Sequence, residues 1–113
     1  MLQKVVADMK KDKAGTIARI NKGEFHDHDL YPFCMRAADG ITTAHPTNVG
    51  TNILELKDKQ GKAFGKEMFA VAEEGKVKSV AYMWPKPGRS EPAPKESYVT
   101  KVGDQICGVG YYR

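Results

Sequence analysis

The stretch that decides the fold is residues 56–72, LKDKQGKAFGKEMFAVA, together with YMWPKP at 82–87 and PKESYV at 94–99. Residues 58–61 have the composition of a tight turn, and residues 63–73 carry apolar side chains at helical spacing up to a stop at Gly75. Residues 77–84 and 95–102 have the pattern of strands, joined by a proline-rich segment over 85–94. This order predicts a helix followed by two adjacent antiparallel strands.

Further elements extend this unit in both directions. Gly103-Asp104 is a turn into a last strand over 105–112, and residues 31–37 and 41–44 read as two strands around a turn at 38–40. Asn52 can cap a short helix. Residues 2–21 repeat apolar side chains at helical spacing, with a polar interruption at 10–13 and a stop near Gly23. We expect an α+β domain in which a long N-terminal helix precedes a five-stranded antiparallel sheet with connecting helices.

Composition sets the class of protein. The chain has 113 residues, enough for one domain, with 41% hydrophobic and 28% charged residues, as in soluble globular proteins. No apolar run reaches the roughly 18 residues that span a bilayer, and residues 1–13 do not resemble a secretory signal. If the protein works outside the cytoplasm, this chain is a mature or trimmed form. The net charge of +4 is spread over scattered lysines, so we do not expect a nucleic-acid partner.

Enzyme and metal chemistry have little support. No nucleophile elbow, phosphate-binding glycine loop or zinc protease helix occurs in the chain, so we expect no catalytic residues and no cofactor. His26 and His28 alternate with Asp27 and Asp29, which at first suggests a metal site. A second ligand pair at a recognised spacing is lacking, so we favour a solvated loop and predict no metal.

The last strand, ICGVGYY at 106–112, contains a pattern that points to a cavity. Strand alternation places Gly108 and Gly110 on one face, where the missing side chains leave a gap. Either a ligand or tightly packed protein atoms could fill that gap, and the pattern does not decide between them. A small-ligand pocket needs apolar walls and a few polar anchors. The candidate ligand-binding residues are Phe33, His45, Met68, Tyr82, Trp84, Lys95, Tyr98, Gly108 and Gly110.

Two cysteines, Cys34 and Cys107, fall in the first and last expected strands, each on the side opposite to Phe33 and Gly108. If those strands are neighbours, a cross-strand disulfide is possible and would favour an oxidising compartment. Two buried thiols acting as small apolar side chains are the alternative.

Six motifs occur in order along the chain: FHDHDLYPF at 25–33, DGITTAHP at 39–46, VGTNILELKDKQGKAFGKEM at 49–68, YMWPKP at 82–87, PKESYV at 94–99 and VGDQICGVGYY at 102–112. Together they resemble the single Cache domain, a small-molecule sensing domain of bacteria that stands alone or forms part of a chemoreceptor. Residues 1–24 match only in being helical. We therefore divide the chain into an N-terminal helix over 1–24 and a Cache domain over 25–113.

The resemblance implies a PAS-like sheet with the strand order 2-1-5-4-3, which puts the two cysteine-bearing strands side by side and favours the disulfide. It also implies a pocket between the sheet and the segments that connect strands two and three. Ligands of the family are short carboxylates, amino acids, amines or related metabolites. The implied location is periplasmic or secreted, with any membrane contact made by segments outside this chain.

The expected function is non-enzymatic sensing of a small metabolite, as in signal transduction or chemotaxis. Lys95 is the expected anion partner, and the N-terminal helix could pair two copies as a homodimer. The alternative is a protein-interaction or dimerisation module whose pocket is vestigial and filled by its own side chains.

Overall fold

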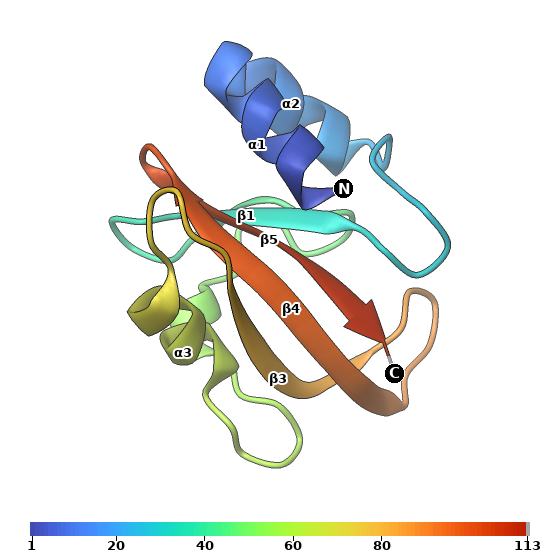
Figure 1. Cartoon of the computed structure of the whole chain (residues 1–113). Coiled ribbons are helices and arrows are strands. Elements are labelled where there is room, and N and C mark those ends of the chain that lie inside the picture. Colours follow the sequence, from blue (N-terminus) through green and yellow to red (C-terminus); the bar gives the residue numbers. More distant parts are fainter. Residues whose placement is uncertain (113) are drawn as a thin grey trace.

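A computed structural model describes residues 1–112 of the chain. Its sheet has five antiparallel strands in the order β2-β1-β5-β4-β3. Two helices cover one face of the sheet, and a third helix and a short 3₁₀ helix cover the other (Figure 1). The elements are α1 (Leu2–Lys11), α2 (Lys13–Asn21), β1 (Pro32–Arg36), β2 (Thr42–Ala44), η1 (Ile53–Glu55), α3 (Phe64–Val71), β3 (Lys78–Pro85), β4 (Pro92–Val102) and β5 (Gln105–Tyr112). The predicted α+β class and strand order are confirmed.

The single helix expected over 2–21 is two helices that meet at Asp12. This residue has a non-helical backbone, and its Oδ1 accepts a hydrogen bond from the Gly15 N–H at 3.0 Å. The Asp12 carbonyl accepts another from the Thr16 hydroxyl at 2.8 Å. An aspartate that caps a new helix competes with continuation of the old one. The polar interruption at 10–13 is therefore a helix boundary.

The first and last strands of the sheet lie side by side and are cross-linked. β1 pairs with β5 over its whole length, with Cys34 directly opposite Cys107. The two cysteines form a disulfide between residues 73 positions apart in the chain. A cross-link that closes so long a loop constrains the unfolded chain and stabilises the fold by about 4 kcal/mol.

The proline-rich connection between β3 and β4 is shorter than expected. β4 begins at Pro92, so part of the segment predicted as a linker over 85–94 is strand. Within residues 1–112, the part of β4 before Lys95 pairs only with β3, because the pairing with β5 begins at Lys95 opposite Tyr112. A proline lacks the N–H that a second neighbour would need, so it fits a strand segment that has one partner.

Asp58 attaches the turn at 58–61 to β3, an edge strand of the sheet. One carboxylate oxygen accepts hydrogen bonds from the N–H groups of Gln60 and Lys62, both at 2.9 Å. The other oxygen accepts from the Met83 N–H at 3.0 Å. The pKa of Asp58 lies below its usual value, chiefly because of the Met83 and Lys62 donors. The turn is thus held next to residues 82–84.

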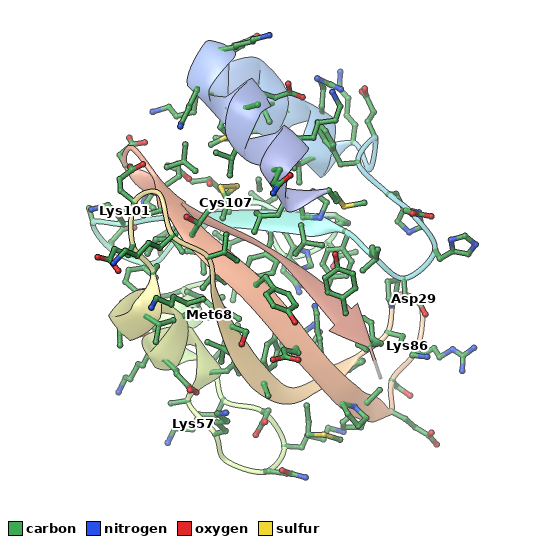
Figure 2. The ribbon with its side chains drawn as sticks, viewed as in Figure 1. Asp29, Lys57, Met68, Lys86, Lys101 and Cys107 are labelled. Atoms are coloured by element: carbon green, nitrogen blue, oxygen red, sulfur yellow. A yellow bond between two sulfur atoms is a disulfide. The ribbon has the colours of Figure 1, made fainter. Side chains whose placement is uncertain are left out.

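Alternate residues of the strands build two separate apolar clusters. The cluster under α1 and α2 contains Cys34 and Cys107, and the cluster under α3 contains Met35, Met68 and Ile106. Figure 2 shows Cys107 between the sheet and the N-terminal helices, with Met68 on the opposite side beside α3. The candidate pocket residues other than Tyr98 lie in or beside the second cluster.

Candidate functional site

Lys95 of β4 lies at the centre of the site and is 3% exposed. Its Nζ donates a hydrogen bond to the Tyr31 hydroxyl at 3.0 Å. Nζ is 4.5 Å from the centroid of the Tyr31 ring and 5.1 Å from that of Tyr112, and it is 5.8 Å from the rings of both Phe33 and Tyr82. Ring faces attract a cation, so the amine sits in an aromatic cage.

The charge of Lys95 has no acidic partner in the part of the chain that the structure describes. Burial lowers the pKa of Lys95 to about 7, because removing an ammonium group from water disfavours its charged form. A buried amine of this kind is available to an anion from outside.

Gly110 makes room for this lysine. A Cβ atom built on Gly110 would overlap Lys95 Cε and would lie 2.6 Å from Ser97 Oγ. Gly108 serves a neighbouring ring in the same way, since its Cβ would lie 2.7 Å from Phe33 Cζ. The hollow expected beside the two glycines is therefore filled by protein, and the tight-packing alternative is the correct one for the glycines themselves.

His45, which follows β2, presents a hydrogen-bond donor beside Lys95. Its Nδ1 accepts hydrogen bonds from the N–H groups of Thr47 at 3.0 Å and Asn48 at 3.1 Å. Burial, and then the charge of Lys95, lowers the pKa of His45 to about 4. The imidazole is therefore neutral at pH 7, and its proton is on Nε2. The ring packs edge-on against Tyr31 with centroids 5.0 Å apart.

Three aromatic rings form the opposite wall. Phe64, at the start of α3, stacks on Tyr82 with centroids 4.3 Å apart, and Trp84 stands edge-on to Phe64 at 5.3 Å. The Tyr82 and Ser97 hydroxyls share a hydrogen bond of 2.8 Å. Burial raises the pKa of Tyr82 above its usual value, so the wall stays uncharged at neutral pH.

Two cavities meet at these residues. The inner cavity, of about 30 Å³, is bounded by Lys95 and the aromatic walls. The outer cavity, of about 470 Å³, opens beside the loops at 57–59 and 85–92. Both are lined by Tyr31, His45, Asn48 and Trp84.

Two sequence-predicted residues do not line this site. Tyr98 lies on the opposite face of the sheet, 37% exposed and edge-on to Tyr111 with centroids 5.6 Å apart. Alternation along β4 places Lys95 and Ser97 on one face and Tyr98 on the other. Met68 is fully buried in the cluster under α3 and borders neither cavity. Phe64, one helical turn earlier, supplies the side chain that α3 contributes.

The sequence reasoning missed Tyr31, Tyr112 and Phe64. Tyr31 lies two residues before Phe33 and Tyr112 two residues after Gly110, so alternation alone assigns both to the cavity face. Tyr112 also donates a hydrogen bond to the Pro85 carbonyl at 2.7 Å, which ties the end of β5 to the β3–β4 connection.

The histidines at 26 and 28 lie apart from this centre. His26 lines the outer cavity, whereas His28 is exposed and its Nδ1 lies 2.7 Å from Asp27 Oδ1. Over residues 1–112 no group of three His, Cys, Asp or Glu side chains is arranged to hold a metal ion.

The fold defines a PAS-like domain. A PAS domain of an HTR-like protein from Haloarcula marismortui superposes with a TM-score of 0.56 at 12% identity, over 88% of this chain and 99% of that one. The model of the family single Cache domain 2 matches residues 3–112. The chain therefore belongs to the single Cache domain 2 family, a non-enzymatic family of chemosensory domains, and the predicted resemblance is confirmed.

Similar proteins include chemotaxis receptors. The methyl-accepting chemotaxis protein McpP of Pseudomonas putida is 36% identical over 92 residues, which are 77% of this chain and 17% of that protein. A Cache chemosensory domain solved to explain carboxylic acid recognition superposes with a TM-score of 0.76 at 32% identity, over 91% of this chain and 72% of that one. A periplasmic sensor domain of a chemotaxis protein gives 0.76 at 23% identity, over 97% and 86%, which shows a shared fold. The chain thus spans about a sixth of the curated relative.

Proposed function

We propose that this chain is the ligand-binding domain of a chemosensor and that it binds a small organic carboxylate at Lys95. The observation that carries the proposal is a buried amine without an acidic partner among residues 1–112, enclosed by aromatic rings. A carboxylate would supply the missing negative charge and accept hydrogen bonds from Lys95 Nζ and His45 Nε2. A solved relative is described as recognising carboxylic acids.

The positive charge of Lys95 determines which class of ligand the site favours. A buried ammonium group repels a cationic ligand, so simple amines are disfavoured relative to acids. The inner cavity is close to the volume of one water molecule in the liquid. A carboxylate therefore enters only if side chains around the inner cavity move, and a ligand that stabilises this opened arrangement shifts the domain between two states.

The proposed location is outside the cytoplasmic membrane. The disulfide between Cys34 and Cys107 fits an oxidising compartment, and a similar fold belongs to a periplasmic sensor domain. In residues 1–112 no helix is long and apolar enough to cross a bilayer. We propose further that residues 1–24 and 25–113 act as one unit, because α1 and α2 pack on the same sheet through the cluster around Cys34.

Thermal unfolding with a panel of carboxylic acids, amino acids and amines tests the binding. An acid at about 100 times its dissociation constant adds roughly 2.7 kcal/mol of stability. Lys95→Met should abolish this shift. Lys101→Met is the matched control, because Lys101 is on the same face of β4 at its far end and lies outside both cavities (Figure 2). If no acid stabilises the wild-type chain, or if Lys95→Met responds as the wild type does, the proposal is wrong.

A second candidate function is association of two copies, favoured by an exposed apolar groove on the helix side of the sheet. Val77, Tyr98 and Tyr111 are exposed there and line a cavity of about 490 Å³ with the start of α1. Sedimentation at several concentrations tests this candidate. A monomer at high micromolar concentration would contradict it.

A further inference from the structure

The outer cavity has apolar walls and a charged rim. Trp84 lines both the outer and the inner cavity. The rest of the apolar lining of the outer cavity includes four prolines, Pro46, Pro85, Pro87 and Pro92. Lys57, Lys59 and Arg89 also line it, but all three are exposed. The cavity therefore resembles a small-ligand pocket with apolar walls, and it shares Trp84 with the inner cavity beside the buried amine.

The two cavities differ so much in volume that they would hold different parts of one ligand. The inner cavity, at about 30 Å³, has room for little more than one water-sized group. The outer cavity is about 470 Å³, the size of a pocket for a whole metabolite. A carboxylate that reaches Lys95 must therefore leave the rest of its molecule in the outer cavity.

We propose that this domain selects carboxylic acids with an extended apolar body, either a medium-length alkyl chain or an aromatic ring, over acids of two or three carbons. The inference rests on the proposed function, since the carboxylate lies at Lys95 and His45. The body of the ligand lies against Trp84 and the proline side chains that follow it on the β3–β4 connection.

The expected gains in affinity favour a ligand with an apolar body over a ligand with a second acidic group. Each methylene group that is buried raises affinity about fourfold. An ion pair with an exposed lysine or arginine raises it by at most about fivefold and is weakened by salt. Lys86, a less exposed cation that also lines this cavity, already lies 3.7 Å from Asp29, and Figure 2 shows the two residues side by side. The rim cations therefore attract anions to the cavity, and the apolar wall discriminates among them.

Calorimetric titration of the whole chain at pH 6.5 with acetate, butyrate, pentanoate, hexanoate, phenylacetate and glutarate tests the inference. We expect affinity to rise about fourfold per added methylene from acetate to hexanoate, and phenylacetate to bind at least tenfold more tightly than acetate. Trp84→Ala should reduce the affinity for hexanoate at least tenfold and that for acetate much less. Val77→Ala, in the groove on the far side of the sheet, is the control for apolar binding elsewhere and should leave every affinity unchanged.

The outcomes separate this inference from the proposed function. If acetate binds as tightly as hexanoate, carboxylate binding stands and selection for an apolar body is wrong. Glutarate binding more than fivefold more tightly than its monocarboxylate analogue, pentanoate, would also overturn the inference, because the rim cations would then decide selectivity. If no acid binds at millimolar concentration, both proposals fail. The wild-type ligand series decides between these outcomes even if Trp84→Ala does not fold.

Discussion

The two faces of the sheet are built from alternate residues of the same strands, yet they differ in chemistry. On the helix side, Cys34 and Cys107 form a cross-link within an apolar cluster that also includes Val5, Met9 and Ile20. On the α3 side, the equivalent layer contains a buried amine, three buried hydroxyls and a ring of aromatic side chains. The helix side joins the first strand to the last, whereas the α3 side holds polar groups that packing alone does not need.

This difference suggests that the helix face stabilises the fold and that the α3 face binds the ligand. Buried polar groups lower stability unless they are satisfied, and Lys95 has a neutral hydroxyl as its hydrogen-bond partner in place of a carboxylate. Such a site needs a scaffold that stays closed around it, and the disulfide of the opposite face provides one. We therefore expect changes on the helix face to alter stability alone, and changes that remove or displace the buried amine of the α3 face to alter carboxylate binding.

Removal of the disulfide should have the largest effect. The variant Cys34→Ala/Cys107→Ala is expected to lose about 4 kcal/mol of unfolding free energy, because the unfolded chain regains the freedom of a long loop. Urea denaturation of the oxidised wild type, the reduced wild type and the variant measures this loss. The folded variant should bind carboxylates within threefold of wild type, since both sulfurs lie on the far face. A variant that keeps its stability but loses carboxylate binding would show that the helix face does not act on stability alone.

Lys95→Met should act in the opposite direction and stabilise the unliganded domain by about 3 kcal/mol at pH 7. Holding the amine at a pKa of about 7 in place of its unfolded value costs roughly 4 kcal/mol near neutral pH, and loss of the hydrogen bond to Tyr31 returns about 1 kcal/mol. Between pH 7 and the unfolded pKa, the unfolded chain holds a proton that the folded chain has released. The unfolding free energy of the wild type therefore rises with pH. The amount by which Lys95→Met is more stable than the wild type falls by about 1.4 kcal/mol per pH unit.

Urea denaturation of both proteins between pH 6 and pH 9.5 tests this prediction, with Lys101→Met as the control. Lys101 is partly exposed on the same strand, so this variant controls for the loss of a lysine as such. Equal or lower stability of Lys95→Met at pH 7 would show that the amine is not a destabilising group.

Carboxylate affinity should fall about 50-fold between pH 7 and pH 9. Binding needs charged Lys95, which is half protonated near its pKa of about 7 and about 1% protonated two pH units higher. His45, whose pKa is about 4, stays neutral in this range. The pKa values of Tyr31, Tyr82 and Tyr112 are raised, chiefly by burial, so these groups also keep their protons.

Calorimetry of acetate and hexanoate binding at pH 8, in buffers with different ionisation enthalpies, should detect uptake of about one proton per ligand. The Lys95→Arg side chain stays charged at every pH used, so any carboxylate affinity that this variant retains should not fall between pH 7 and pH 9. A wild-type affinity that is constant from pH 7 to 9 would show that Lys95 is not the anion partner.

The sequence was sufficient for the alternation that separates these faces. It assigned Cys34 and Cys107 to one side and Phe33, Gly108 and Gly110 to the other, and the resemblance supplied the strand order. It could not show what fills the gap beside each glycine, because the filling side chain comes from a neighbouring strand and depends on register. That is a long-range property of the sheet.

The errors at the site have similar causes. Tyr98 belongs to the predicted aromatic lining, yet strand alternation places it on the face opposite to Lys95. Met68 and Phe64 share a face of α3, and only the position of the helix over the sheet decides which reaches the cavity. The buried state of Lys95 was also beyond the sequence, since a lysine in a strand is normally exposed.

The two glycines of β5 provide the last and smallest test of the comparison. Gly108→Ala and Gly110→Ala should each cost about 1–2 kcal/mol of unfolding free energy, because an added methyl group overpacks a filled space. At Gly108 the methyl group meets Phe33, Val99 and the Tyr98 carbonyl, so that variant should change stability with little change in carboxylate affinity. At Gly110 it displaces the stem of Lys95 and breaks the hydrogen bond to Tyr31, so that affinity should change more than fivefold. Calorimetric titration with acetate, beside urea denaturation of both variants, separates the two effects. Equal affinities in the two variants would show that Gly110 does not position Lys95 for its ligand.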